Sequence, residues 1–158
     1  MKRTKPHQKT VSTQSRALST QTGQIISAHG RHYFVELENG EVIKCFPRGK
    51  RGGLCVGDWV EISTQGERAA IEQRHERKNL LYRSDEMRTK QFAANIDQLF
   101  IVLAAEPMFS EDLAGRALVA ARCADIEPII ILNKADLPSV ALARQRLQPL
   151  AALGVPIK

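Results

Sequence analysis

Cysteine is scarce in this sequence, and the three cysteines present form no recognisable disulfide or metal-binding pattern. Their number is odd and the sequence has no Cys-x-x-Cys, which argues against a disulfide framework and a zinc ribbon. His29 and His32 also lack companion ligands at the spacing of a metal site. The sequence therefore predicts no metal centre within these 158 residues.

Long hydrophobic runs are also missing. The longest uncharged apolar run spans residues 99–105, far short of the roughly 20 residues that a bilayer requires. No apolar stretch follows the N-terminal lysines, so the sequence shows no signal peptide. With 43% hydrophobic residues and a net charge of +6, general disorder is excluded as well. We expect a folded, monomeric protein of the cytoplasm with no membrane partner.

Acidic residues are absent from the first 20 positions, which carry five basic residues among many Ser, Thr and Gln. We expect residues 1–21 to form a basic, disordered tail because such a composition cannot pack a core. A tail of this charge suits a polyanion, most simply nucleic acid. The competing interpretation is a solubilising terminus or a cloning remnant.

Residues 22–73 have the alternating pattern and turn spacing of a small β barrel. A longer gap, rich in Gly and basic residues, separates the third strand from the fourth. Five short strands with that gap predict an OB-fold, and an SH3-like barrel is the competing interpretation. The expected strands are residues 24–28, 31–37, 41–46, 59–63 and 69–73.

Residues 92–158 change to the strand and helix order of a parallel α/β domain. The continuous apolar run at residues 99–103 predicts a strand covered on both faces, and residues 129–132 predict a second buried strand. The intervening residues 74–91 are rich in charge, and we interpret them as a linker.

Two helices are expected in this α/β part. Ser110 can cap the first, with two acidic residues in its opening turn. Ser139 can cap the second, which Gly154 would end. The residues expected on the buried face of the first helix are Leu113, Ala117, Ala121 and Ala124.

The second predicted strand of the α/β part runs directly into Asn133, Lys134, Ala135 and Asp136. Ligands of open α/β sheets bind at the carboxyl ends of strands. Two carboxylate oxygens of Asp136 can accept the N1–H and amino hydrogens of guanine together, whereas adenine would leave the carboxylate unpaired. Asn133 can brace the loop and the stem of Lys134 can cover the base. The loop predicts guanine binding, against a helix-capping loop with incidental polarity.

The phosphate loop that usually accompanies guanine recognition is missing. No Gly-x-x-x-x-Gly-Lys-Ser/Thr occurs, and the single Gly-Lys pair at Gly49 and Lys50 is followed by Arg51. In an ordinary GTPase the phosphate loop also precedes the guanine motif, whereas a barrel precedes it here. A circularly permuted GTPase would produce this order.

The chain resembles the ribosome small-subunit-dependent GTPase A family (RsgA, also called YjeQ). The likeness covers about residues 22–158 and is clearest at residues 56–60, 93–98 and 126–137. In that family an OB-fold precedes a GTPase domain whose guanine motif comes before the phosphate loop. The resemblance implies a β barrel followed by the start of a parallel α/β, circularly permuted P-loop-type GTPase domain, truncated at Lys158. Residues 155–158 look like the start of a further strand.

The resemblance also implies GTP hydrolysis during late maturation of the small ribosomal subunit, with rRNA contacts from the barrel. The phosphate loop, the residues that bind Mg and the ligands of a structural Zn would lie beyond Lys158. No catalytic or metal-binding residue is therefore assigned in this chain, and the 158-residue polypeptide is expected to be inactive. GTP is the expected cofactor of the family.

Four barrel residues are candidates for RNA contact. Arg48, Lys50 and Arg51 are flanked by glycines that free them to reach phosphates, and Trp59 can stack on a base. Two aromatic residues share a barrel face with polar neighbours and can also stack on bases, or can plug a barrel end or meet the GTPase part: Phe34 and Phe46. Three further cations either join the phosphate contacts or form a solvated linker: Arg74, Arg77 and Lys78.

Two functional classes remain open from the sequence. The first is a GTPase that assists ribosome assembly. The second is a non-enzymatic OB-fold RNA-binding module whose α/β part is structural.

Overall fold

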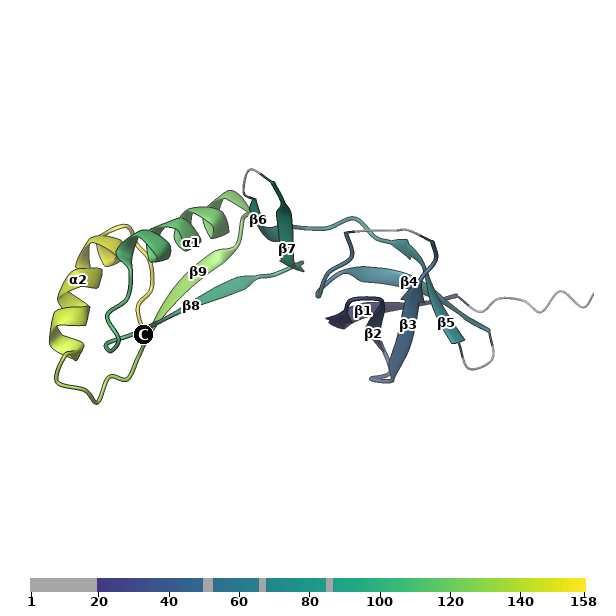
Figure 1. Ribbon diagram of the computed structural model, residues 1–158, viewed down its shortest axis with the longest axis horizontal. Coiled ribbons are helices and arrows are strands. Elements are labelled where there is room, and N and C mark those ends of the chain that lie inside the picture. The colour runs from purple at the N-terminus through teal and green to yellow at the C-terminus, as the bar shows by residue number, and fades with distance from the viewer. Residues whose placement is uncertain (1–19, 50–52, 66–67, 85–86) are drawn as a thin grey trace, which may run out of the picture.

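A computed structural model describes residues 20–49, 53–65, 68–84 and 87–158. A β barrel and an α/β unit occupy the two ends, and a β hairpin lies between them (Figure 1). Most of the predicted basic tail lies outside the described residues.

Five strands form the barrel, and it is closed. Their order is β1-β2-β3-β5-β4, with β4 returning to pair with β1. β5 pairs in parallel with β3 and antiparallel with β4. This order confirms the OB-fold and excludes the SH3-like alternative. The strands are β1 (Thr20–His29), β2 (His32–Leu37), β3 (Val42–Pro47), β4 (Trp59–Gln65) and β5 (Arg68–Arg74).

The barrel interior is filled by small and branched aliphatic side chains. Alternation places Val60 and Ile62 inside, fully buried, and Trp59 outside on the same strand, as the sequence predicts. Burying a branched aliphatic side chain contributes about 1.5–3 kcal/mol, so this cluster is the main source of barrel stability. Its members are Ile25, Val35, Leu37, Cys45, Val60, Ile62, Ala69 and Ile71.

The predicted linker is more ordered than its composition suggests. Strands β6 (Leu80–Ser84) and β7 (Thr89–Ala94) pair as an antiparallel hairpin. Interpreting all of residues 74–91 as a linker was therefore wrong. Charged side chains such as Arg83 and Lys90 lie on the hairpin, and they hide its strand pattern in the sequence.

The α/β unit is a parallel strand pair with a helix after each strand. It consists of β8 (Gln98–Ala104), α1 (Glu111–Cys123), β9 (Glu127–Asn133) and α2 (Val140–Ala152). β8 and β9 are parallel, and Ile157 adds a parallel bridge to Ile130 on the other side of β9. The bridge confirms that the residues after α2 begin another strand contact.

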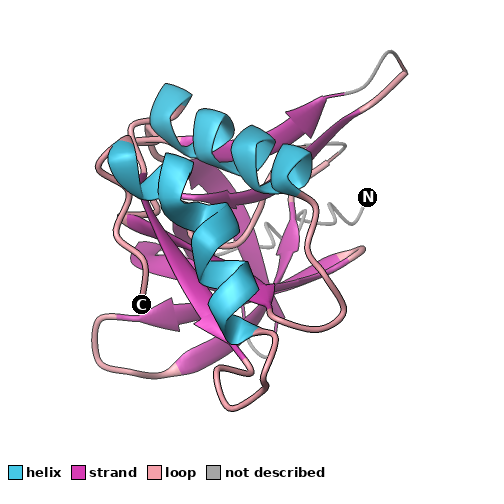
Figure 2. Ribbon diagram, turned by 90° about the vertical axis from the view of Figure 1, so that its left-hand side faces the viewer, coloured by secondary structure: helices cyan, strands magenta, loops and turns pink. Residues whose placement is uncertain are grey.

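Both helices cover the same face of this strand pair. Ile101, Leu103, Ile130 and Leu132 point toward the helices and form one core with them, and the helices lie in front of the strands in Figure 2. The opposite face carries Phe100 and Val102, which are exposed. The expectation that the first strand is covered on both faces was therefore wrong for the described residues.

The buried face of α1 also differs from the prediction. Its fully buried residues are Ala114, Leu118 and Ala121, whereas Leu113 is exposed. The apolar arc of α1 is wide because alanines and leucines occur at neighbouring positions. The buried face of α1 is therefore shifted by about one residue from the predicted one. Of the four residues predicted to be buried, Ala121 alone is buried.

The helix ends follow the predicted residues with one exception. Ser110 caps α1 because its Oγ accepts a bond from the amide of Leu113 at 3.3 Å. Ser139 precedes α2 but makes no side-chain capping bond. Gly154 follows α2 with φ +76°, a conformation that glycine adopts without strain.

Among the described residues, no helix combines the length and apolar character needed to cross a membrane.

Candidate functional site

The loop after β9 gathers the three candidate guanine-binding residues. Asn133 ends β9 and pairs with Ala104 of β8, which fixes the start of the loop at the edge of the sheet. The Oδ1 of Asn133 accepts a bond from the amide of Lys134 at 2.8 Å. Lys134 has φ +58°, and its carbonyl accepts from Leu137 at 3.2 Å. The chain therefore makes a tight turn between β9 and α2.

Glu106 holds this turn from the loop that follows β8. Its backbone oxygen accepts a bond from the Nζ of Lys134 at 2.7 Å, and its carboxylate accepts one from the Oγ of Ser139 at 2.6 Å. Ser139 is therefore engaged with Glu106 instead of capping α2. Lys134 and Ser139, at the two ends of the loop after β9, are therefore both hydrogen-bonded to Glu106 in the loop after β8.

Asp136 lies between these two anchors and is exposed. No hydrogen bond or ion pair joins its carboxylate to another residue of the described ranges. Both oxygens are consequently available to hydrogen-bond donors from outside the protein. A carboxylate held on a braced loop with free acceptors is suited to bind two neighbouring N–H groups.

The candidate RNA contacts of the barrel are only partly described. Arg48 directly follows β3 and forms an ion pair with Glu72 at 3.0 Å, with more than half of its side chain exposed. Trp59 opens β4 and is 39% exposed. The two therefore lie on the strands that flank β5. Lys50 and Arg51 lie outside the described residues.

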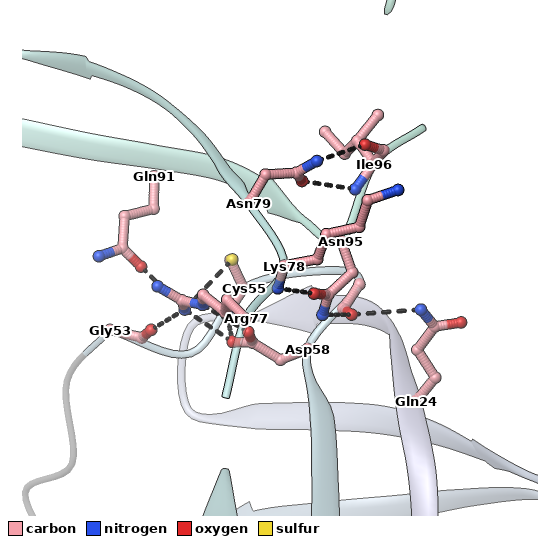
Figure 3. A network of polar contacts seen from close by, with 11 residues as sticks. Gln24, Gly53, Cys55, Asp58, Arg77, Lys78, Asn79, Gln91, Asn95 and Ile96 are labelled. Atoms are coloured by element: carbon pink, nitrogen blue, oxygen red, sulfur yellow. Dashed lines mark hydrogen bonds and ion pairs between the residues drawn. The ribbon is translucent and has the colours of Figure 1, made fainter. Parts of the chain in front are cut away.

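Arg77, considered from the sequence as an RNA contact or a solvated linker residue, is neither. Its Nε and Nη2 bind the two oxygens of Asp58 at 2.6 and 2.8 Å (Figure 3). The side chain of Asp58 is 0% exposed and that of Arg77 only 12%. The hydrogen bond to Asp58 raises the pKa of Arg77. Arg77 also donates to the carbonyl of Gly53 at 2.5 Å.

A second group of contacts joins the barrel to the hairpin beside this ion pair. The Nδ2 of Asn95 donates to the carbonyl of Gly57 at 2.8 Å, and its Oδ1 accepts from the amide of Lys78 (Figure 3). The amide of Ala94 donates to the carbonyl of Val56 at 2.8 Å. We call these contacts, with the Asp58–Arg77 pair, the junction. It holds the barrel against the hairpin through polar bonds, among which the Asp58 carboxylate is fully buried.

Sequence reasoning missed Glu106 and the partnership of Asp58 with Arg77. Each depends on residues 19 or more positions apart, and no local spacing rule links them. No local signal marked Asp58, because an acidic residue in the turn before β4 is usually exposed.

Metal ligands are not found in the described part of the chain, where no three His, Cys, Asp or Glu side chains form a group able to hold an ion. Within the described ranges, the residues therefore offer no donor set for Mg or Zn. No reaction step is therefore derived through either metal.

Comparison with known proteins extends this description. The family model described as RsgA GTPase matches residues 74–158, more than half of the chain. A protein of Bordetella pertussis named small ribosomal subunit biogenesis GTPase RsgA is 61% identical over 137 residues, covering 85% of this chain and 46% of the relative. Its namesake in Burkholderia pseudomallei is 52% identical over 135 residues, covering 84% of this chain and 43% of the relative.

A solved structure has the same arrangement. The crystal structure of YloQ, described as a circularly permuted GTPase, superposes with a TM-score of 0.63 at 27% identity, covering 88% of this chain and 50% of that chain. This chain spans about half the length of the curated relatives it matches. Its fold is an OB-type barrel followed by the start of a circularly permuted GTPase domain. The chain belongs to the RsgA GTPase family.

Proposed function

We propose that this chain supplies guanine recognition and RNA binding to a GTP-hydrolysing factor of small-ribosomal-subunit maturation, acting late in that process. The observation that carries the proposal is the exposed Asp136, held with both oxygens free on the loop after β9. Relatives that share this part of the chain are named small ribosomal subunit biogenesis GTPases. The partners would be a guanine nucleotide, the small ribosomal subunit and its rRNA.

Each residue of the loop has a distinct role in this proposal. Asp136 accepts the N1–H and amino hydrogens of guanine. Asn133 keeps the turn closed through its bond to the amide of Lys134. The stem of Lys134 lies beside the base while its ammonium stays on the Glu106 carbonyl. Phosphoryl transfer needs a phosphate cradle and magnesium, so hydrolysis requires residues additional to these.

Replacing Asp136 with Asn tests the guanine site. In a longer protein that carries these residues together with a phosphate loop, we expect GTP affinity to fall about 10- to 100-fold, because a bidentate base contact is worth roughly 1–3 kcal/mol. XTP affinity should rise, since the amide donates where xanthine has a carbonyl. Titration with fluorescent GTP and XTP analogues measures both affinities.

A matched control for this variant is Asp125→Asn, an equally exposed carboxylate at the opposite end of β9. It should change neither affinity. An Asp136→Asn protein that keeps its preference for GTP over XTP would refute the assignment of Asp136 as the base reader.

The barrel is proposed to bind rRNA through Arg48, Lys50, Arg51 and Trp59. Arg48 is largely exposed despite its ion pair with Glu72, and Trp59 presents a ring on the barrel surface. A non-enzymatic RNA-binding role of this barrel is the second candidate function. It is favoured by the exposed Arg48 and Trp59, whose RNA contacts need no bound nucleotide, and an absence of guanine selectivity in the unsubstituted protein would support it.

Replacing Arg48, Lys50 and Arg51 together with Ala tests the phosphate contacts. We expect weaker binding to an rRNA fragment and a shallower dependence of affinity on salt. Each lost phosphate contact reduces the slope of log K against log[salt] by about 0.7–0.9. Arg116, Arg122 and Arg144 lie exposed on the helices, and their triple Ala variant removes the same charge as a control. An unchanged slope in the barrel variant, equal to that of the control, would rule out these contacts.

A further inference from the structure

Four aromatic rings cluster on the outer surface of the barrel. His29 stacks on His32 with ring centroids 5.3 Å apart, and Phe34 meets both histidines edge-on at 5.7 Å. Phe46 lies 6.2 Å from His32. We call these four residues the ring cluster. It extends across β1, β2 and β3, which are adjacent in the barrel.

The ring cluster is not needed to fill the barrel. The buried core is wholly aliphatic apart from Cys45, and Phe46 keeps 45% of its surface exposed. His29 is exposed and the other two rings are half-buried. Phe34 and Phe46 therefore do not belong to the buried cluster that fills the barrel. A protein that leaves neighbouring rings in water offers flat apolar faces to a ligand.

Cations border the same surface. The Nζ of Lys44 lies 5.8 Å from the centre of the Phe46 ring. Beside Phe46 is a groove of about 440 Å³ whose lining includes Arg48 and Arg68. Glu72 pairs with Arg48 and also accepts from Ser63, so one acidic residue at the groove is already engaged. Among the described residues, the lining of the groove holds two arginines and no acidic residue.

Rings bordered by cations match the chemistry of an unpaired nucleic-acid strand. Bases stack on aromatic faces with little sequence preference, and the cations contact the phosphates between them. A duplex, whose bases are already stacked on each other, would gain nothing from exposed rings. An acidic peptide would use the cations but would leave the rings without a function.

We propose that the ring cluster is a stacking platform for unpaired bases of single-stranded RNA, with Lys44 and Arg68 contacting the adjacent phosphates. This inference rests on the proposed RNA binding of the barrel and adds the binding surface and the form of RNA. The face across β1–β3 is separate from Trp59, which opens β4 next to Gln24.

The test uses the 158-residue polypeptide and a fluorescein-labelled 12-nucleotide polyuridine, with affinity measured by fluorescence anisotropy. Phe46→Ala should weaken binding about tenfold, since stacking contributes roughly 1–3 kcal/mol per base. Phe46→Leu keeps an apolar side chain without a flat face and should weaken binding similarly. Phe46→Tyr keeps the face and should bind within about twofold of the original. The salt slope should stay unchanged in all three.

Phe92→Ala is a matched control. Phe92 is also 45% exposed, and Lys90 lies 5.6 Å from its ring, but the pair is on the hairpin outside the barrel. This variant should bind polyuridine normally. A 12-base-pair RNA duplex should bind equally to the original and to every Phe46 variant.

Three outcomes would overturn the platform. In the first, Phe46→Ala and Phe46→Leu bind polyuridine as tightly as the original protein. In the second, Phe92→Ala loses as much affinity for polyuridine as Phe46→Ala does. In the third, the Phe46 variants lose affinity for the duplex as well as for polyuridine. Each leaves RNA binding by the barrel standing. If the original polypeptide binds neither RNA, the proposed RNA function fails together with the platform.

Discussion

Replacing Arg77 with Ala is expected to lower the free energy of unfolding by about 3–5 kcal/mol, because it strands a buried charge. Asp58 is 0% exposed, and Arg77 supplies two of its bonds. The amide of Cys55 also donates to this carboxylate, at 2.9 Å, and carries no charge that could neutralise it. Urea unfolding followed by circular dichroism measures the loss, since a shift in the midpoint at constant slope reports stability.

Arg74→Ala is the matched control for this prediction. Arg74 is exposed and three residues from Arg77, so its removal should cost less than about 0.5 kcal/mol. Combining Arg77→Met with Asp58→Asn should cost less than the sum of the single variants, because neither charge is then left alone. If Arg77→Ala is as stable as Arg74→Ala, the ion pair does not stabilise the junction.

Replacing Gly57 with Ala is expected to detach the hairpin from the barrel. A Cβ at this position would lie 2.0 Å from the carbonyl oxygen of Ala94, and the backbone has φ +88°. The left-handed conformation alone costs an L-residue roughly 1–2 kcal/mol. The overlap with a backbone atom adds to this, since it forces apart the segments joined by the Val56–Ala93 bridge. Hydrogen exchange of the Ala94 amide, which donates to Val56, should become fast.

Gly40→Ala separates the two causes. Gly40 has φ +82° but nothing within 4 Å of the added Cβ, so it should show only the conformational cost and leave exchange at Ala94 unchanged. Slow exchange at Ala94 in Gly57→Ala would contradict this prediction, because it would mean that the backbone accommodates the added Cβ without breaking the Ala94–Val56 hydrogen bond.

The barrel was predictable because aliphatic and polar residues alternate over parts of its strands. Val60 and Ile62 inside with Trp59 outside follow from the two-residue period alone. The hairpin was not predictable in this way. Its two strands carry exposed polar residues on much of their length, so the period is weak, and what orders them is pairing with each other and with Val56.

The α/β unit was predictable in order but not in orientation. Aliphatic runs and caps locate the strands and helices, whereas the covered faces depend on which neighbours are present. Leu113 and Leu118 are equally apolar in the sequence, yet only Leu118 is buried. Local propensity cannot distinguish them, because burial is decided by tertiary packing.

The loop that we propose to bind guanine could be identified from four consecutive residues, because the chemistry that suggests this role is local. The hydrogen bonds from Lys134 and Ser139 to Glu106 could not be predicted in this way, because Glu106 lies 28 residues before Lys134 and 33 before Ser139. The Asp58–Arg77 pair was also missed because its two residues lie 19 positions apart in the sequence. Arg77 was grouped with solvent-facing cations because charge in a polar segment is usually exposed.

The fluorescence of Trp59 can report on the junction. Trp59 is the only tryptophan of the chain, it follows Asp58 directly, and its carbonyl accepts a bond from the amide of His75 at 2.8 Å. Excitation at wavelengths that only indole absorbs therefore reports on one place, where the barrel meets the segment leading to the hairpin. A shift in its emission would record loosening there while the far α/β unit stays silent, and no attached dye is required.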